Sequence, residues 1–351
     1  MSLHSTREPA PVLLIPYTWI GDFVRGHSVV KLLRAQSPER PVDILATPLC
    51  APLVAYMPGV RKALVAELPR RRISLRQQIA LSELIEAENY GQTIVLPRTW
   101  KAVLAPILAG VPVRTGFFGE ARVVLINDLR FGERALPRMI DRMGSLALPK
   151  NAPLPKDWPL PELIVPPREI DAWRVRRGLA GERRPVVTLA PGAVGAGKAW
   201  PVSHFAQLAR ALAADGLSVW VLGGPSEAEL AKQIISLGGA SVRDLTGNDL
   251  RDAILAHAAA DVAVTNDSGL MHVAAALGTP TVAIFGPTSA WHQKPLNPLA
   301  AIIEPPGDDA ARERARTEGN DAVAHMRTDD VAVEAVLAAV RRVLGKGAAN
   351  P

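Results

Sequence analysis

Polar residues gather where one apolar segment of the C-terminal half ends. The stretch Val262 to Pro287, VAVTNDSGLMHVAAALGTPTVAIFGP, begins as an apolar strand, passes through Thr265 to Gly269 and enters a short helix. Gly278 ends that helix, and a second apolar strand covers Thr281 to Phe285. In a parallel sheet such a turn opens at the carboxyl edge, where ligands bind, and a helix start presents free backbone N–H groups that favour a phosphate. We therefore expect an anionic ligand at this edge.

A glycine-rich loop supplies a second candidate for phosphate binding. The segment Pro191 to Lys198, PGAVGAGK, follows an apolar strand, and Gly192 to Lys198 fit the first seven positions of a P-loop. The eighth position, which should hold Mg²⁺ through a hydroxyl, is Ala199, and Pro201 interrupts the helix that should start there. The pattern favours a diphosphate clamp of another kind over an ATP-hydrolysing P-loop. A flexible loop with a solvated lysine is the remaining alternative.

Two single residues could act near such a ligand. Asp22 follows Gly21 in the first predicted strand-to-helix turn of the chain, where a carboxylate could serve as a general base. The same position equally suits a helix N-cap, because Asp is favoured just before a helix. His272 lies one turn into the helix after Gly269, and it could face the ligand or pack internally.

The basic residues are unevenly distributed. The net charge is +6, and residues 1–165 carry 21 Lys and Arg against 14 Asp and Glu, a net of +7, which leaves −1 for the remainder. One run comprises Arg61, Lys62, Arg70, Arg71, Arg72 and Arg76, and a second comprises Arg98, Lys101, Arg114, Arg122 and Arg130. A basic half suits a phosphorylated substrate or an anionic membrane surface, or is simply a solvated surface. Nucleic acid is disfavoured, because no aromatic residues interleave with the first run.

These residues need α/β elements to position them. Apolar strands are predicted at Val12–Ile15, Val42–Ala46, Thr93–Leu96, Val186–Ala190, Leu217–Leu222 and Val242–Leu245, besides the two named above. Helices are predicted at Phe23–Ala35, His204–Ala214, Ser226–Leu237, Leu250–Ala258 and Asp329–Leu344. Seven prolines in residues 148–167 indicate a stiff interdomain linker. The fold class expected is α/β, with two doubly wound domains facing a cleft.

Composition excludes several classes of protein. The single cysteine, Cys50, excludes an intramolecular disulfide and a cysteine-rich zinc site. No run of about 18 apolar residues predicts a transmembrane helix. The first ten residues lack the apolar core of a secretory signal, so the expected compartment is the cytoplasm. Residues 345–351 are expected to be a disordered tail.

Together these motifs resemble the bacterial lipopolysaccharide heptosyltransferases, glycosyltransferase family 9. The strongest part is TNDSGLMHVAAA, Thr265 to Ala276, which is similar to the family signature almost residue for residue. The block from Arg114 to Arg130 is similar to one typical of heptosyltransferases of type II. Trp19 to Asp22 and Val95 to Pro97 with Lys101 also match, so the resemblance runs from about Val12 to Leu344.

The resemblance implies a glycosyltransferase of the GT-B fold that moves heptose from ADP-heptose, with inversion, to the heptosylated inner core of lipopolysaccharide. It places an acceptor domain at 1–160, a nucleotide-sugar domain at 161–328 and a C-terminal helix with tail at 329–351. Asp22 would be the catalytic base. The implied donor-binding residues are Gly192, Lys198, Thr265, Asn266, Asp267, Ser268, Gly269, Leu270 and His272. The implied acceptor-binding residues are Trp19, Lys101, Arg114, Glu120, Arg122 and Arg130.

The expected partners follow from the same resemblance. They are the ADP-sugar, the phosphorylated core of lipid A and an anionic inner-membrane surface touched from its cytoplasmic side. No nucleic acid, metal or other cofactor is expected, and the protein is expected to be a monomer. Val194, Gly195 and Ala199 depart from the family's usual donor loop, which leaves open a different sugar or core acceptor, as in types I and III. A rival of another class is a non-catalytic nucleotide- or anionic-lipid-binding protein.

Overall fold

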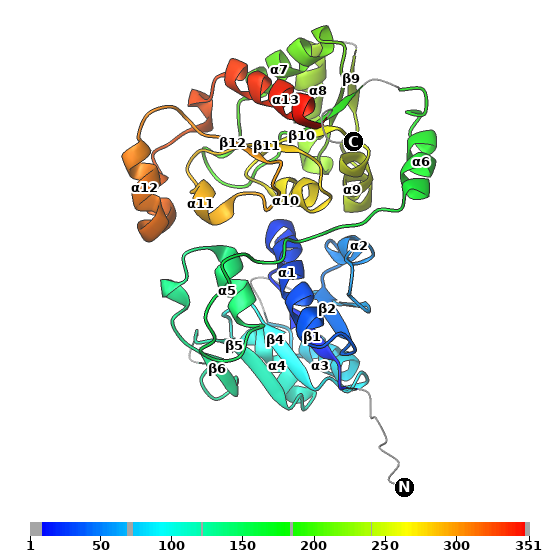
Figure 1. Ribbon diagram of the computed structural model, residues 1–351. Helices are drawn as coiled ribbons and strands as arrows, with labels where there is room; N and C mark the ends of the chain where they lie inside the picture. The colour runs from blue at the N-terminus through cyan, green and yellow to red at the C-terminus, as the bar shows by residue number, and fades with distance from the viewer. Residues whose placement is uncertain (1–8, 69–72, 121, 183–184, 240, 348–351) are drawn as a thin grey trace. The chain divides into compact units, whose positions relative to one another are not determined.

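A computed structural model describes residues 9–68, 73–120, 122–182, 185–239 and 241–347. The chain divides into two compact units, unit 1 (Met1–Pro161) and unit 2 (Glu162–Pro351). Each unit holds one six-stranded sheet whose neighbouring strands are all parallel (Figure 1). The expected domain boundary lies one residue before the observed division.

Unit 1 is built on the strand order β3-β2-β1-β4-β5-β6. Its strands are β1 (Val12–Ile15), β2 (Val42–Ala46), β3 (Ala63–Val65), β4 (Gln92–Val95), β5 (Val113–Phe117) and β6 (Asp128–Arg130). Its helices are α1 (Ile20–Gln36), α2 (Ala51–Val54), α3 (Leu75–Glu86), α4 (Lys101–Leu108), the 3₁₀ turn η1 (Glu133–Ala135) and α5 (Met139–Ser145).

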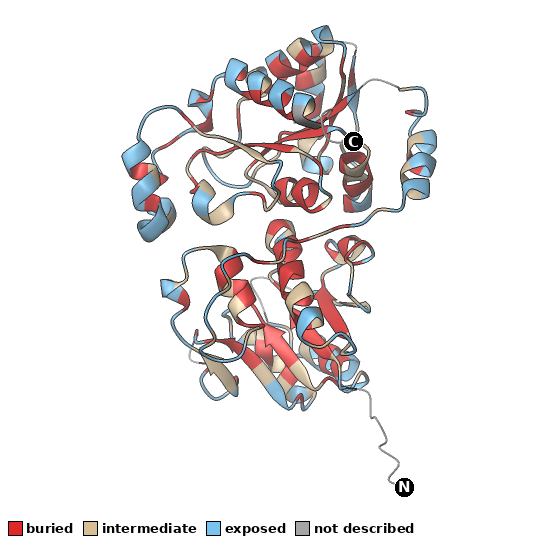
Figure 2. Cartoon of the chain, viewed as in Figure 1, coloured by how far each residue is buried: buried red, intermediate tan, exposed pale blue. Residues whose placement is uncertain are grey.

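The central strands of unit 1 are apolar on both faces because helices cover both. Leu13 and Ile15 of β1 pack in one cluster with Ile85 of α3 and Val103 of α4. On the other face α1 packs with α5, and a Cβ at Gly26 of α1 would make ordinary van der Waals contact with Leu14 and Leu96. The strands are accordingly buried while the outer helix faces stay exposed (Figure 2).

Unit 2 repeats the arrangement with the strand order β12-β11-β10-β7-β8-β9. Its strands are β7 (Val186–Ala190), β8 (Ser218–Val221), β9 (Val242–Asp244), β10 (Val262–Asn266), β11 (Thr281–Ile284) and β12 (Ala301–Ile303). Its helices are α6 (Pro167–Arg176), α7 (Val202–Ala214), the 3₁₀ turn η2 (Pro225–Glu227), α8 (Ala228–Gly238), α9 (Leu250–Ala258), α10 (Gly269–Ala276), α11 (Ala290–Gln293), α12 (Asp309–Glu318), the 3₁₀ turns η3 (Gly319–Val323) and η4 (Thr328–Asp330), and α13 (Val333–Gly347).

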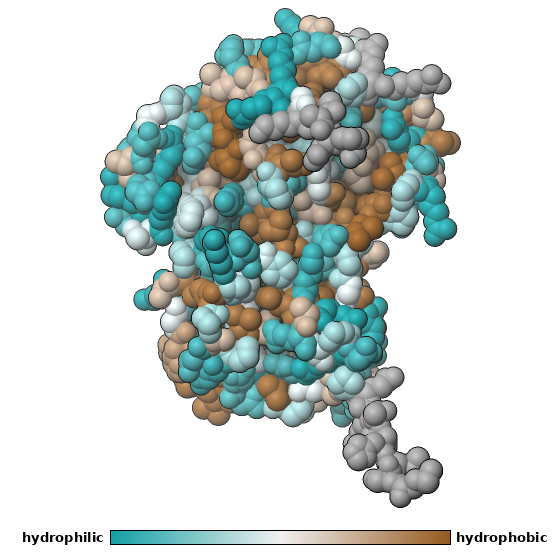
Figure 3. Space-filling model, in the orientation of Figure 1, coloured by the Kyte–Doolittle hydropathy of each residue, from teal (hydrophilic) through white to brown (hydrophobic). Residues whose placement is uncertain are grey.

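Helices again cover both faces of the sheet in unit 2. Phe205 of α7, Ile234 of α8 and Val340 of α13 form one cluster with the strands, whereas Trp173 of α6 and Leu255 of α9 lie in another. Helix α13, which the sequence analysis set apart from the domain at 161–328, therefore belongs to the core of unit 2. Helix α12 lies at the periphery, and hydrophilic atoms cover it in Figure 3.

The predicted α/β class is confirmed, and the differences are local. Helix α1 begins at Ile20 rather than Phe23, α13 begins at Val333 rather than Asp329, and α13 continues to Gly347 where a disordered tail was expected. Residues 348–351 of that tail lie outside the described residues. The proline-rich linker is packed rather than free: buried Trp158 donates to Asp141 in unit 1, and Leu163 N donates to Ala276 O in unit 2.

Strand order fixes where each unit can bind a ligand. In unit 1 the strands β2 and β3 are added on one side of β1, and β4, β5 and β6 are added on the other. In unit 2 the same switch of side occurs between β7 and β10. Loops leaving the carboxyl ends of two such strands diverge to opposite faces, which opens a crevice at the sheet edge. Asp22 follows β1, Lys198 follows β7 and Asp267 follows β10.

Candidate active site

The switch point of unit 2 brings the glycine-rich loop and the Asn-Asp-Ser turn together. Lys198 Nζ donates to Asp267 Oδ2 at 2.8 Å, and Thr288 Oγ1 donates to the same oxygen at 2.8 Å. Thr288 follows β11, the strand next to β10, so three neighbouring strand ends contribute to one contact. A lysine ion pair that stays partly exposed at this edge is a ready cation for a phosphate oxygen.

The loop holds this geometry through its own glycines and a buried asparagine. Gly195 (φ +120°) and Gly197 (φ +73°) adopt conformations that side chains rarely tolerate. Asn266 is fully buried, accepts from Trp200 N at 3.1 Å and donates to Pro191 O at 2.7 Å. Asn266 therefore clamps both ends of the loop. Gly195 departs from the family's usual donor loop, and its positive φ is the reason that a glycine suits this position. Val194 beside it is exposed.

Helix α10 completes this site with its first turn. Ser268 is its N-cap, and Gly269 and Leu270 are its first residues, so their N–H groups belong to the turn that lacks intrahelical acceptors. The hydroxyls of Thr265 and Ser268 are buried and have no hydrogen-bond partner within the described residues. His272 lies within α10 and is buried, with 5% of its surface exposed.

Glu227 is a residue of this edge that the sequence analysis missed. It ends η2 after β8, and its Oε2 accepts from Gly224 N at 2.7 Å. A Cβ placed on Gly192 would lie 3.0 Å from Glu227 Cγ, so Gly192 serves close packing against this carboxylate. An acidic residue at the end of the second strand of such a fold is positioned to bind ribose hydroxyls. The sequence signal that could have identified Glu227 is an acidic residue shortly after the strand that became β8.

Asp22 lies at the switch point of unit 1 and is not a helix cap. Trp19 is the N-cap of α1, and it makes no side-chain cap hydrogen bond, so Asp22 occupies the third helical position. Arg25 Nη1 donates to Asp22 Oδ1 at 2.7 Å, with side chains 4% and 19% exposed respectively. A carboxylate in the first turn also gains from the helix dipole. The N-cap alternative is thus replaced by an oriented, partly accessible carboxylate.

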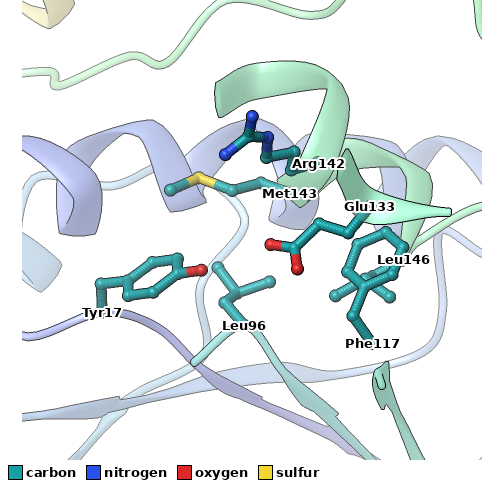
Figure 4. Close-up of a pocket in the computed structure, with 7 residues that line it drawn as sticks. All are labelled: Tyr17, Leu96, Phe117, Glu133, Arg142, Met143 and Leu146. Atoms are coloured by element: carbon teal, nitrogen blue, oxygen red, sulfur yellow. The ribbon is translucent and has the colours of Figure 1, made fainter. Parts of the chain in front are cut away.

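A polar cluster stands near Asp22 within apolar walls. The Tyr17 hydroxyl and the Glu133 carboxylate point toward one another, with Arg142 above them and with Leu96, Phe117, Met143 and Leu146 around them (Figure 4). Burial raises the pKa of Tyr17 to about 12, and the charges of Glu133 and Asp22 add to this shift. Burial also raises the pKa of Glu133, against the opposing effect of Arg98 and Arg142. Tyr17 therefore stays a neutral phenol at neutral pH.

The predicted acceptor residues do not all reach this edge. Arg122 is buried, and its guanidinium donates to Phe117 O at 2.6 Å and Pro97 O at 2.6 Å, so it shapes the loop instead of facing solvent. Arg114 lies at the amino end of β5, away from Asp22, and binds the carbonyls of Val111 and Leu125. Arg122 and Arg114 therefore hold loops through backbone carbonyls, and the expected contact with the acceptor is not supported for either residue.

The other acceptor candidates lie at the carboxyl edge. Arg130 pairs with Asp128 at 2.9 Å, and Glu120 Oε2 accepts from Trp100 N at 3.1 Å. Lys101 begins α4, and Trp19 is half-exposed before α1. In the first basic run, Arg61 and Lys62 both pair with Glu88, whereas Arg70, Arg71 and Arg72 lie outside the described residues.

The described residues hold neither a candidate metal centre nor a membrane-spanning helix. They contain no group of three His, Cys, Asp or Glu side chains arranged to hold a metal ion. Within the same described ranges, no helix is both long and apolar enough to cross a membrane.

Comparison with known proteins gives one consistent answer. Residues 78–323 match the model of glycosyltransferase family 9 (heptosyltransferase). The chain is 35% identical over 305 residues to lipooligosaccharide heptosyltransferase 2 of Haemophilus influenzae, covering 83% of this chain and 88% of that protein. It is also 35% identical to lipopolysaccharide heptosyltransferase 2 of Escherichia coli, covering 83% and 87%. The solved structure of the E. coli ADP-heptose heptosyltransferase II superposes with a TM-score of 0.78 at 32% identity, covering 96% of this chain and 99% of that one.

Proposed function

The chain belongs to glycosyltransferase family 9, and we propose that it transfers heptose from ADP-heptose to the heptosylated inner core of lipopolysaccharide. The names of the similar proteins, which are heptosyltransferases of type 2, support this activity. The observation that carries the proposal is the Lys198–Asp267 contact at the switch point of unit 2, beside the start of α10. That edge suits a sugar diphosphate.

Unit 2 would bind the donor through its nucleotide and its phosphates. Lys198 would turn from Asp267 toward a phosphate oxygen, and the N–H groups of Ser268, Gly269 and Leu270 would face the same charge. The buried hydroxyls of Thr265 and Ser268 would find partners once the donor is bound. Glu227 would accept from the ribose hydroxyls, and His272 lies one turn beyond the phosphate-binding residues.

Asp22 would act as the general base for an inverting displacement. The acceptor hydroxyl gives its proton to the Asp22 carboxylate as its oxygen forms a bond to the anomeric carbon. The bond from that carbon to the phosphate oxygen breaks, and ADP leaves with the electron pair. Lys198 and the α10 amides stabilise the charge that develops on ADP. Arg25 orients the Asp22 carboxylate through their 2.7 Å hydrogen bond.

The remaining expectations are parts of the same proposal. The Lys198 ammonium and the backbone N–H groups at the start of α10 would together neutralise the diphosphate. The proposed reaction therefore needs no metal or other cofactor. The enzyme works as a monomer at the cytoplasmic face of the inner membrane, where it meets a phosphorylated lipid A core. Trp19, Lys101 and Arg130 are the candidates for acceptor contacts that stand near the edge of unit 1.

A second candidate is a family 9 enzyme with a different sugar or core acceptor. The loop from Val194 to Ala199 favours it, because Gly195 imposes a backbone of its own at φ +120° and Val194 presents no polar group. The family match and the heptosyltransferase 2 relatives speak against the rival of another class, a non-catalytic nucleotide- or anionic-lipid-binding protein of the same fold.

Acceptor-dependent release of ADP separates these possibilities. The purified protein is incubated with ADP-heptose and the heptosylated core, with ADP-glucose and with ATP plus Mg²⁺ as parallel reactions. The proposal predicts ADP release only with ADP-heptose and acceptor together, and a heavier core by mass spectrometry. ADP release with another sugar would favour the second candidate, and binding without release would favour the non-catalytic protein.

A further inference from the structure

A second cation lies against the glycine-rich loop of unit 2, on a segment that comes from much later in the chain. Arg327 is the N-cap of η4, between the α12–η3 segment and α13. A Cβ placed on Gly197 would lie 3.1 Å from Arg327 Cδ and 3.3 Å from Arg327 Nη1. The arginine side chain therefore lies against the backbone of Gly197, the residue just before Lys198.

Thr328, the next residue, attaches this segment to the same loop. Its side chain is fully buried, and Thr328 Oγ1 lies 3.1 Å from Gly197 O and donates to Ala199 O at 2.8 Å. A Cβ on Gly286, shortly after β11, would lie 2.9 Å from both Gly197 O and Thr328 N. The backbone that carries Arg327 is thus held next to the loops that leave the carboxyl ends of β7 and β11.

A further attachment joins η3 to the loop after β11. Asn320 Oδ1 in η3 accepts from Ser289 N at 2.9 Å, one residue beyond Thr288. Met326 is buried with Val323 in a small apolar cluster that includes residues of α12. The segment before Arg327 therefore has a packed core of its own and a fixed position at this sheet edge.

Two carboxylates make a further cation favourable at the donor site. Asp267 loses its cation when Lys198 turns to a phosphate, and Glu227 adds a second negative charge after β8. Arg327 is exposed, and its Nη1 donates to two backbone carbonyls of its own segment. It forms no ion pair with an acidic side chain among the residues that the structure describes, so its charge is available to an anion.

We infer that Arg327 is a second phosphate-binding cation of the donor site. A guanidinium presents several N–H donors in a fixed fork, which suits the oxygens of a nucleoside diphosphate. Gly197 has no side chain, and this leaves the space in which Arg327 lies beside the loop that carries Lys198. The inference rests on the proposed binding of an ADP-sugar to unit 2, and it adds a residue that comes from outside the strand-end loops of that site.

Calorimetric titrations with ADP and with adenosine test the inference without any turnover. Arg327→Gln removes the charge but keeps an amide that can donate to backbone carbonyls. It should weaken ADP binding about tenfold and leave the affinity for adenosine unchanged. Arg327→Lys keeps the charge without the fork and should lose about threefold. Arg314→Gln is the matched control, because Arg314 is an exposed arginine of α12 that pairs with Glu318, and it should bind ADP as the unchanged protein does.

Two results would overturn the role of Arg327 alone. The first is an ADP affinity of Arg327→Gln within about twofold of Arg314→Gln. The second is an equal loss of affinity for ADP and for adenosine, because that would show that Arg327 only maintains the shape of the loop. Absence of ADP binding by the unchanged protein would instead overturn both the inference and the proposed donor.

Discussion

Replacement of Lys198 by Met probes the contact on which the donor site rests. Lys198 Nζ lies 2.8 Å from Asp267 Oδ2, and the Asp267 side chain is only 9% exposed. In Lys198→Met the donor loses a charge-assisted hydrogen bond, which contributes about 1.5–3 kcal/mol. The diphosphate also meets a carboxylate that now lacks its cation. We expect the two effects together to cost about 3 kcal/mol, or roughly 150-fold in the Kd of ADP.

Calorimetric titration of ADP into matched variants separates these two effects. The double variant Lys198→Met/Asp267→Asn removes the uncompensated carboxylate, so its ADP affinity should recover by about tenfold relative to Lys198→Met. Lys232→Met is the control, because Lys232 is an exposed lysine of the same unit that pairs with Glu229 on α8. An ADP affinity of Lys198→Met within about twofold of the control would refute the reasoning.

Three other perturbations test separate parts of the account. Arg25→Met leaves Asp22 without its 2.7 Å donor and should lower turnover about tenfold with ADP affinity unchanged; unaltered turnover would contradict the orienting role. Glu227→Ala should weaken ADP about tenfold but leave binding of 2′,3′-dideoxy-ADP unaffected, and equal losses for both ligands would exclude a ribose contact. Burial lowers the pKa of His257 from 6.5 to about 3, so the unfolded chain binds a proton that the folded chain does not between these pH values. The free energy of unfolding should then fall by about 1.4 kcal/mol per unit as pH drops below about 6.5. His257→Gln should remove this slope in urea denaturation, and an unchanged slope would show that other groups cause it.

The elements that the sequence predicted well are those with long apolar runs and clear ends. Strands Val42–Ala46 and Val186–Ala190 and helix Leu250–Ala258 have the predicted bounds, because each apolar run is flanked by residues that cannot continue it. Strands β3 and β5 were not predicted. Strands β6 and β12 were also missed, because three half-buried residues carry no readable period. Their existence depends on pairing with β5 and β11, which is a property of the sheet.

Site residues could be predicted from the sequence where a reactive side chain directly follows a single predicted strand. Asp22, Lys198 and Asp267 follow β1, β7 and β10, and the strand-to-helix pattern alone indicates that such residues lie at a sheet edge. Thr288 was missed because its approach to Asp267 depends on the order of β10 and β11. Arg122 was assigned to the acceptor because residue type does not reveal that a guanidinium is buried among carbonyls.

The central claim is that Asp22 performs the chemistry and unit 2 holds the donor. The direct measurement is the single-turnover rate of heptosyl transfer by Asp22→Asn, with ADP affinity measured on the same preparation. We predict at least about a 100-fold loss of rate with ADP affinity unchanged, as expected when a general base is removed. A rate close to that of the unchanged enzyme, at equal ADP affinity, would contradict the account.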